Sequence, residues 1–192
     1  MTLESKATEH GLGEQGVWVL ILGDLLIFSL FFLSLIYYGH LQPDIYARGQ
    51  ARLDFPLGLF NSLVLITSSI LAALGLEAVR SGSAKGGGFF AAAMLCGLSF
   101  VAVKTIEYAE KMHTGVTIVS SEFFTFYFVF TGIHLGHVVA GLAALGLIRR
   151  AAEAGPVDAP TLALIESGVL FWHMVDLLWV MLFALFYILE WR

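Results

Sequence analysis

The sequence predicts an all-α integral membrane protein, built as a bundle of five transmembrane helices. Of its 192 residues, 58% are hydrophobic and only 13% are charged, and the mean hydropathy is +0.85. A soluble domain needs far more polar surface than this composition supplies. Five apolar stretches also reach the length of about 20 residues that an α-helix needs to cross a bilayer.

The apolar stretches follow one another with short polar connections, so we expect a single membrane domain over residues 1–192. The last two stretches are longer than a bilayer requires, and we expect them to tilt or protrude. Gly86 to Gly88 indicate a hinge before the third span, and Gly39 to Pro56 is predicted to be a connecting loop. The predicted spans cover residues 17–38, 57–79, 86–108, 121–148 and 162–189.

Charge and cysteine content argue against several classes of protein. The net charge is −5 and no basic run occurs, so a nucleic acid partner is not expected. Cys96 is the only cysteine and cannot form an intrachain disulfide or a cysteine-based metal site. Residues 1–16 have three glutamates and no apolar core, unlike a cleaved signal peptide, so the first span is expected to stay as a signal anchor. The positive charges lean slightly toward a cytoplasmic N-terminus.

Ionisable groups inside the spans are the candidate functional residues, because such groups are costly in lipid and usually face the protein interior or water. His134 and His137 lie one helical turn apart, and His173 and Asp176 repeat that spacing on the next span. The full set of candidates is Asp24, Glu107, His134, His137, Glu166, His173 and Asp176.

The histidines allow two interpretations. A metal or haem site would need several of these groups to converge on one centre, at about 2 Å from a metal ion. A buried hydrogen-bond network would instead pair His173 with Asp176 within one helix, with His134 or His137 bonding to them across the helix interface. We favour the network, and we assign no catalytic residue, no metal ligand and no cofactor-binding residue to this chain.

Three further patterns give expectations about packing. Asp24 is interpreted as a structural bond to a neighbouring helix or lipid headgroup, or as a protonatable carboxyl among apolar neighbours. Gly132 and Gly136 form a pair of small residues that predicts close helix approach. The aromatic runs 123–128 and 183–187 are expected to face lipid.

Several segments, in order along the chain, resemble the haem–copper oxidase (cytochrome c oxidase) subunit III family. Residues 131–141, TGIHLGHVVAG, resemble a helix signature of that family, and residues 171–179, FWHMVDLLW, are similar to its last-helix motif. Glu107-Tyr108 and Asn61-Ser62 also match in position. Asp24 stands where oxidase members have a reactive glutamate, and residues 16–24 look closest to the nitric-oxide reductase accessory branch.

The resemblance implies a non-catalytic accessory subunit of a bacterial plasma-membrane respiratory complex, in aerobic electron transport or in denitrification. Such a subunit binds no haem or copper, packs on catalytic subunit I, and supports turnover and proton uptake. It also holds phospholipid in a cleft between its first two helices and its last three, so we expect headgroups to meet Glu107, Arg149 or His173. A small proton-coupled transporter and a di-haem membrane cytochrome remain alternatives.

Overall fold

A computed structural model describes residues 3–191, with side chains from residue 16 onward. The described chain is 85% helical and contains no strand, which confirms the predicted all-α class. Five of its helices are long and apolar enough to cross a membrane. The N-terminal side chains behind the signal-anchor expectation lie outside the described residues.

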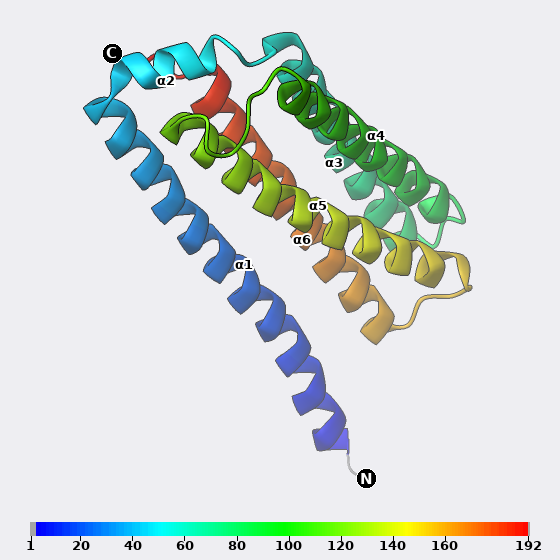
Figure 1. The fold of residues 1–192 in the computed structure, drawn as a ribbon. Helices are drawn as coiled ribbons and strands as arrows, with labels where there is room; N and C mark the ends of the chain where they lie inside the picture. Colours follow the sequence, from blue (N-terminus) through cyan, green and yellow to red (C-terminus); the bar gives the residue numbers. More distant parts are fainter. Residues whose placement is uncertain (1–2, 192) are drawn as a thin grey trace.

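The helices follow the predicted order with one addition (Figure 1). The apolar spans within them extend a few residues beyond most of the predicted boundaries, to 16–41, 55–80, 86–113, 122–153 and 159–188. In chain order the elements are α1 (Leu3–Leu41), α2 (Pro43–Gln50), α3 (Phe55–Arg80), α4 (Gly86–His113), α5 (Glu122–Glu153), α6 (Ala159–Phe183) and the single π-helical turn η1 (Ala184–Ile188).

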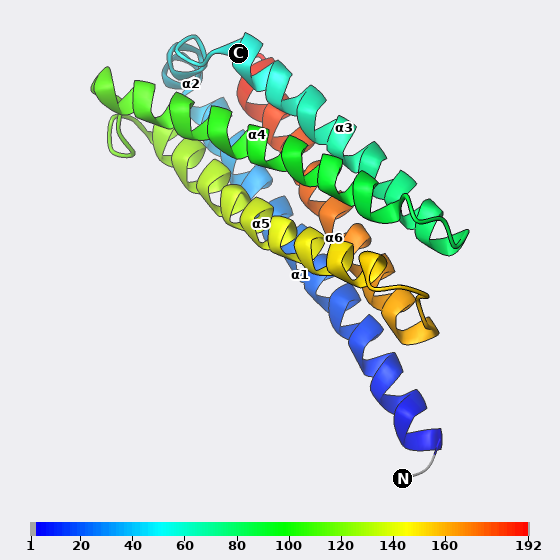
Figure 2. The same cartoon turned by 90° about the vertical axis from the view of Figure 1, so that its right-hand side faces the viewer.

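The connection from Gly39 to Pro56 is not a simple loop, because it contains the short helix α2. Pro43 opens this helix and Asp44 lies in its first turn, where a fixed φ angle and a negative charge both favour a helix start. The helix lies across the end of the bundle that also holds the C-terminus (Figures 1 and 2). Tyr46 and Gly49 are the buried residues of this helix.

The predicted glycine hinge is wrong, since Gly86 and Gly87 form the first turn of α4. Both are buried. A Cβ at Gly86 would lie 2.6 Å from the Val79 side chain, and one at Gly87 would lie 2.5 Å from Glu153. These glycines therefore let α4 start in close contact with the ends of α3 and α5.

The four helices α3 to α6 form the bundle, and α1 lies along its outside. α3 packs against α4 and α6, and α5 packs against α4 and α6, whereas the main contacts of α1 are with α6, α2 and α5. Both views show the N-terminal end of α1 extending beyond the other helices (Figures 1 and 2). The predicted division into two helices and three is therefore wrong, because the second span joins the last three.

Large aromatic side chains fill the centre of the bundle. Trp172 is fully buried, and its indole nitrogen donates to Ser68 Oγ at 3.1 Å. Gly97 and Gly141 face that ring, because a Cβ at either position would lie under 3.0 Å from it. By contrast, a Cβ at Gly132 or Gly136 would meet nothing within 4 Å. The close helix approach predicted at this pair of glycines is thus wrong, and it occurs at Gly141 instead.

The prediction that both aromatic runs face lipid is also wrong. Phe123, Tyr127 and Phe186 are fully buried, with ring centroids about 5.6 Å apart for both Phe123–Phe186 and Tyr127–Phe186. Edge-to-face pairs at this separation are favourable beyond the area that they bury. The two runs therefore bind the start of α5 to the end of the chain.

Replacing Gly141 by alanine should destabilise the isolated protein, because the added methyl group overlaps the Trp172 ring. Overpacking of this kind costs about 1–3 kcal/mol. Thermal unfolding in detergent should show a lower midpoint for Gly141→Ala. Gly136→Ala, on the same helix with open space at its Cβ, is the matched control and should unfold like the original protein. Equal midpoints for the two variants would contradict this packing.

Candidate functional site

A buried ion pair lies in the bundle where α4, α5 and η1 meet. Lys104 and Glu107 are one turn apart on α4, their side chains are each 1% exposed, and Nζ lies 3.0 Å from Oε2. Two tyrosines complete the cluster. Tyr127 and Tyr187 donate to Glu107 Oε1 at 2.6 and 2.8 Å, and their hydroxyl oxygens accept from Lys104 Nζ at 2.9 and 3.3 Å.

Aromatic rings surround the ammonium group as well. Lys104 Nζ lies 4.8 Å from the Tyr127 ring centre and 5.0 Å from that of Trp179. A cation near the face of such rings gains about 2 kcal/mol when desolvated. Together with the hydrogen bonds, these rings replace the water that both charges lose on burial.

We call the group formed by Lys104, Glu107, Tyr127 and Tyr187 the core cluster. Only half of it can be predicted from the sequence. The spacing of Lys104 and Glu107 places both on one face of a helix, which the sequence shows. Tyr127 and Tyr187 belong to the aromatic runs that were expected to face lipid. Tyr187 lies in the π-helical turn, and the larger repeat of that turn is not readable from hydrophobic spacing.

Glu107 therefore does not meet a lipid headgroup, and that expectation is wrong. Its Oε1 accepts from two tyrosines and its Oε2 from Lys104, so the carboxylate is fully engaged inside the bundle. Arg149 lies at the opposite end of α5 and pairs with Glu153 at 2.9 Å.

A second ionic contact joins α1 to α5 within the membrane-spanning part. Asp24 Oδ2 lies 3.3 Å from His137 Nε2, and the two side chains are 21% and 22% exposed. Next to this contact, the Phe28 ring lies 5.7 Å from that of His137. This contact agrees with the structural interpretation of Asp24, because the carboxylate ties α1 to the bundle. The interpretation as a protonatable carboxyl stays a prediction.

His137 contacts its own helix and α1 at the same time. Its Nδ1 lies 2.9 Å from the backbone oxygen of Ile133, and its Nε2 lies 3.3 Å from Asp24 Oδ2. The imidazole ring therefore lies between the α5 backbone and the carboxylate of α1.

The predicted network among His134, His173 and Asp176 is wrong. His173 Nδ1 lies 2.5 Å from Ser69 Oγ on α3. Ser69 also lies beside Asp176, but neither Asp176 oxygen forms a hydrogen bond with the described residues. His134 is fully buried with no hydrogen-bond partner there, and its ring packs 5.4 Å from Trp179 and 5.7 Å from Phe100. The prediction had the wrong neighbouring helix, because His173 contacts α3 and not the predicted α5.

Glu166 joins α6 to α3 near the opposite end of the bundle. Its Oε1 accepts from Arg80 Nη2 at 2.8 Å and from Arg80 Nε at 3.0 Å. The two side chains are 35% and 50% exposed, so this pair is partly solvated and contributes little by itself. Among the described residues, no three His, Cys, Asp or Glu side chains are grouped so that they could hold a metal ion.

An apolar groove of about 260 Å³ lies between α1, α5 and α6. Val17 and Leu20 of α1 form one side, Ala144 and Leu147 of α5 form another, and Leu164 belongs to α6. α1 diverges from the bundle toward this end (Figure 1). The groove lies toward the end where α1 diverges, and its lining is mostly apolar.

The family model described as cytochrome c oxidase subunit III matches residues 3–191. The chain is 32% identical over 146 residues to cytochrome c oxidase subunit 3 of Corynebacterium diphtheriae, across 74% of this chain and 70% of that protein. It is 29% identical over 176 residues to cytochrome c oxidase subunit 3 of Synechocystis, across 91% and 74%. The probable quinol oxidase subunit 3 of Staphylococcus saprophyticus is 25% identical over 193 residues, across 98% and 94%.

Glu107→Gln should strongly destabilise the protein, since it leaves the Lys104 ammonium buried without an opposing charge. Breaking such a pair costs about 3–5 kcal/mol, which thermal unfolding of the purified chain would measure. Glu110→Gln, one turn further on the same helix and exposed, is the control and should have little effect. The double variant Lys104→Met/Glu107→Gln should recover part of the loss. If the Glu107 and Glu110 variants unfold alike, the ion pair does not stabilise the bundle.

Proposed function

Because the chain belongs to the cytochrome c oxidase subunit III family, we propose that it is a non-catalytic accessory subunit of a haem–copper respiratory complex. In this role it packs on catalytic subunit I and has no redox centre of its own. The observation that supports this proposal is that ionisable groups in the spans make contacts within the protein. Lys104–Glu107, Asp24–His137 and Arg80–Glu166 each join one helix to another or fix a tertiary contact.

A proton-coupled transporter fits less well. Transporters commonly form midplane sites from broken helices. Here each span is an unbroken α-helix up to the π-helical turn that ends the last one. The π-helical turn η1 lies at the end of the last span and places Tyr187 in the buried cluster. An accessory role accounts for these continuous helices more directly.

We further propose that the Asp24–His137 pair supports proton uptake by the parent complex. The pair brings a carboxyl group and an imidazole within 3.3 Å of each other, and it is partly exposed on the outside of the bundle rather than sealed in the core. A partner subunit that covers this face would contact both groups at membrane depth. The names of the relatives favour an oxygen-reducing cytochrome c or quinol oxidase as the parent complex. A nitric-oxide reductase is the alternative suggested by residues 16–24.

Phospholipid is the second proposed partner, held with an acyl chain in the groove between α1, α5 and α6. The proposed location is the bacterial plasma membrane, with the N-terminus in the cytoplasm. This orientation is supported by a slight excess of cations on that side.

Purification from native membranes in mild detergent tests the accessory role. We expect a tagged chain to bring down a larger subunit with a haem spectrum, while the chain by itself stays colourless. In the assembled complex, Asp24→Asn should leave the initial turnover nearly intact, because the pair lies outside the redox centre, and should slow turnover as proton supply becomes limiting. Leu22→Asn is the control, because Leu22 is exposed on the same helix. We expect the Asp24–His137 contact to persist in this variant. Stoichiometric haem in the isolated chain would refute the proposal.

The lipid proposal predicts that Ala144→Phe reduces the number of retained lipids, because the new ring fills the groove. Ala143→Phe is the control, since Ala143 is exposed on the same helix and does not line the groove. Native mass spectrometry of the full chain counts the bound lipids. Equal retention by both variants would exclude this groove as the binding site.

A further inference from the structure

Three buried polar side chains from three different helices lie in the bundle core without hydrogen-bond partners. They are Asn61 of α3, His134 of α5 and Asp176 of α6, and every polar side-chain atom of each is unpartnered among residues 16–191. Asn61 and His134 are fully buried, and Asp176 is 5% exposed. In that part of the chain, the one other side chain with such an atom is Trp191, near the C-terminus.

The three side chains are gathered at the level of Trp179. The His134 ring centre lies 5.4 Å from that of Trp179. Asp176 precedes Trp179 by one helical turn on α6, and both are buried. Asn61 directly precedes Ser62, whose Oγ accepts from the Trp179 indole nitrogen at 3.0 Å. Polar groups that are far apart in the sequence therefore meet around one aromatic ring.

The donors beside Trp179 are already engaged. Lys104 Nζ lies 5.0 Å from the Trp179 ring centre, but its three protons are donated to the other members of the core cluster. The Ser62 hydroxyl donates to the backbone oxygen of Gly58 at 2.9 Å. Neither neighbour therefore has a proton left for the unpartnered groups.

The chemistry of these groups indicates which ligand they would take. The Asn61 amide both donates and accepts, a neutral His134 imidazole does the same, and the Asp176 carboxyl group accepts. An apolar ligand would leave all of them unpaired at a high cost in free energy. Water both donates and accepts, and an internal water typically makes about three hydrogen bonds to buried polar groups. Water is thus the ligand that matches the set.

A polar route leads to this site from a pocket of about 360 Å³ between α3 and α6. Arg80 and Glu166 line its outer part, at the end of the bundle opposite α2 (Figure 1). Its inner part reaches half-buried His173, whose Nδ1 lies 2.5 Å from Ser69 Oγ. Ser69 in turn lies beside Asp176. The pocket is therefore connected to the unpartnered groups through two polar side chains.

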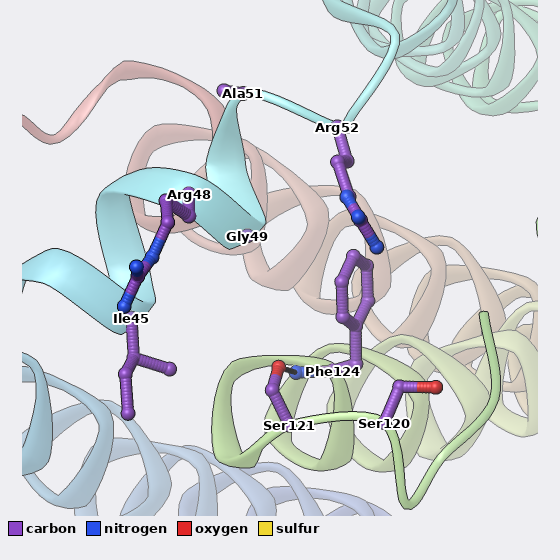
Figure 3. A pocket seen from close by; sticks show the side chains of 8 residues that line it. All are labelled: Ile45, Arg48, Gly49, Ala51, Arg52, Ser120, Ser121 and Phe124. Atoms are coloured by element: carbon purple, nitrogen blue, oxygen red, sulfur yellow. Dashed lines mark hydrogen bonds between the residues drawn. The ribbon is translucent and has the colours of Figure 1, made fainter.

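The pocket of about 460 Å³ between α2 and the start of α5 offers no comparable site (Figure 3). Its charged side chains, Arg48 and Arg52, are exposed, and Figure 3 shows them pointing in different directions. None of the unpartnered buried groups lines it. The core site is distinguished by buried groups that need a partner.

We propose that Asn61, His134 and Asp176 bind water inside the bundle, at the level of Trp179, and that this water exchanges with solvent through the pocket at His173. Such water satisfies polar groups that lipid leaves without partners. It also joins α3, α5 and α6 at one level by hydrogen bonds that their side chains do not form directly. The inference is independent of the accessory role, because it rests on groups of this chain alone.

Brief X-ray radiolysis of the full chain in lipid nanodiscs tests the site. Hydroxyl radicals formed from bound water modify the side chains next to it, and mass spectrometry identifies them. Phe100 is the reporter, because it is fully buried and its ring centre lies 5.7 Å from that of His134. Phe90, also fully buried on α4 but packed against Gly75, is the matched reference. We expect modification of Phe100 to be well above that of Phe90.

Two double variants test which groups hold the water. His134→Leu/Asp176→Leu removes polar groups from the site and should reduce modification of Phe100 to the level of Phe90. His134→Gln/Asp176→Asn keeps polar groups at both positions and should retain the modification. The thermal midpoint of each variant verifies folding, and His134→Leu alone replaces the first double variant if that variant fails to fold.

Mixing with H₂¹⁸O shortly before exposure tests the route. We expect ¹⁸O to reach Phe100 more slowly in His173→Leu than in the original chain, whereas Leu170→Met, a control in the same pocket, should not change the rate. Unchanged exchange in His173→Leu would overturn the route. Equal modification of Phe100 and Phe90 in the original chain, or equal modification of Phe100 in the polar and apolar double variants, would overturn the water site itself.

Discussion

The buried ion pair of Lys104 and Glu107 is the constraint on which the bundle depends, because a charged group in lipid must find all its partners within the protein. The two charges are on α4, and they are satisfied by Tyr127 from α5 and Tyr187 from the final turn. Three separate parts of the chain are thereby held at one point. The π-helical turn contributes to the same cluster, since it contains Tyr187, whose hydroxyl donates to Glu107.

The rest of the bundle is organised around the ends of this cluster. Trp179 packs beside the ammonium group and donates to Ser62 Oγ at 3.0 Å, which fixes α6 against α3. About two turns earlier on α6, Trp172 makes the equivalent bond to Ser68. Each tryptophan buries a large ring and satisfies its single polar atom on the neighbouring helix, so packing and hydrogen bonding determine the same register.

The first helix is attached differently, and this difference bears on function. Its contacts with the bundle include one half-buried ionic pair, Asp24–His137, and a stacked ring pair, Phe31–Phe130, with centroids 4.9 Å apart. An apolar groove remains where α1 diverges toward its N-terminal end. The contact between α1 and the bundle is thus where the proposed proton and lipid roles of an accessory subunit would lie.

The sequence by itself determined the number of spans, the helix class and the family. Hydrophobicity over about 20 residues depends only on local composition, and capping residues such as Asp54 and Ser121 mark helix starts within a few positions. The tertiary structure decided which groups meet. Helical spacing correctly placed His173 and Asp176 on one face, but the periodicity of one helix does not say which other helix lies opposite, and that neighbour is α3 with Ser69. The same limit explains why Tyr127 and Tyr187 were assigned to lipid: an aromatic ring suits either environment, and only the position of Glu107 in space draws their hydroxyl groups inward.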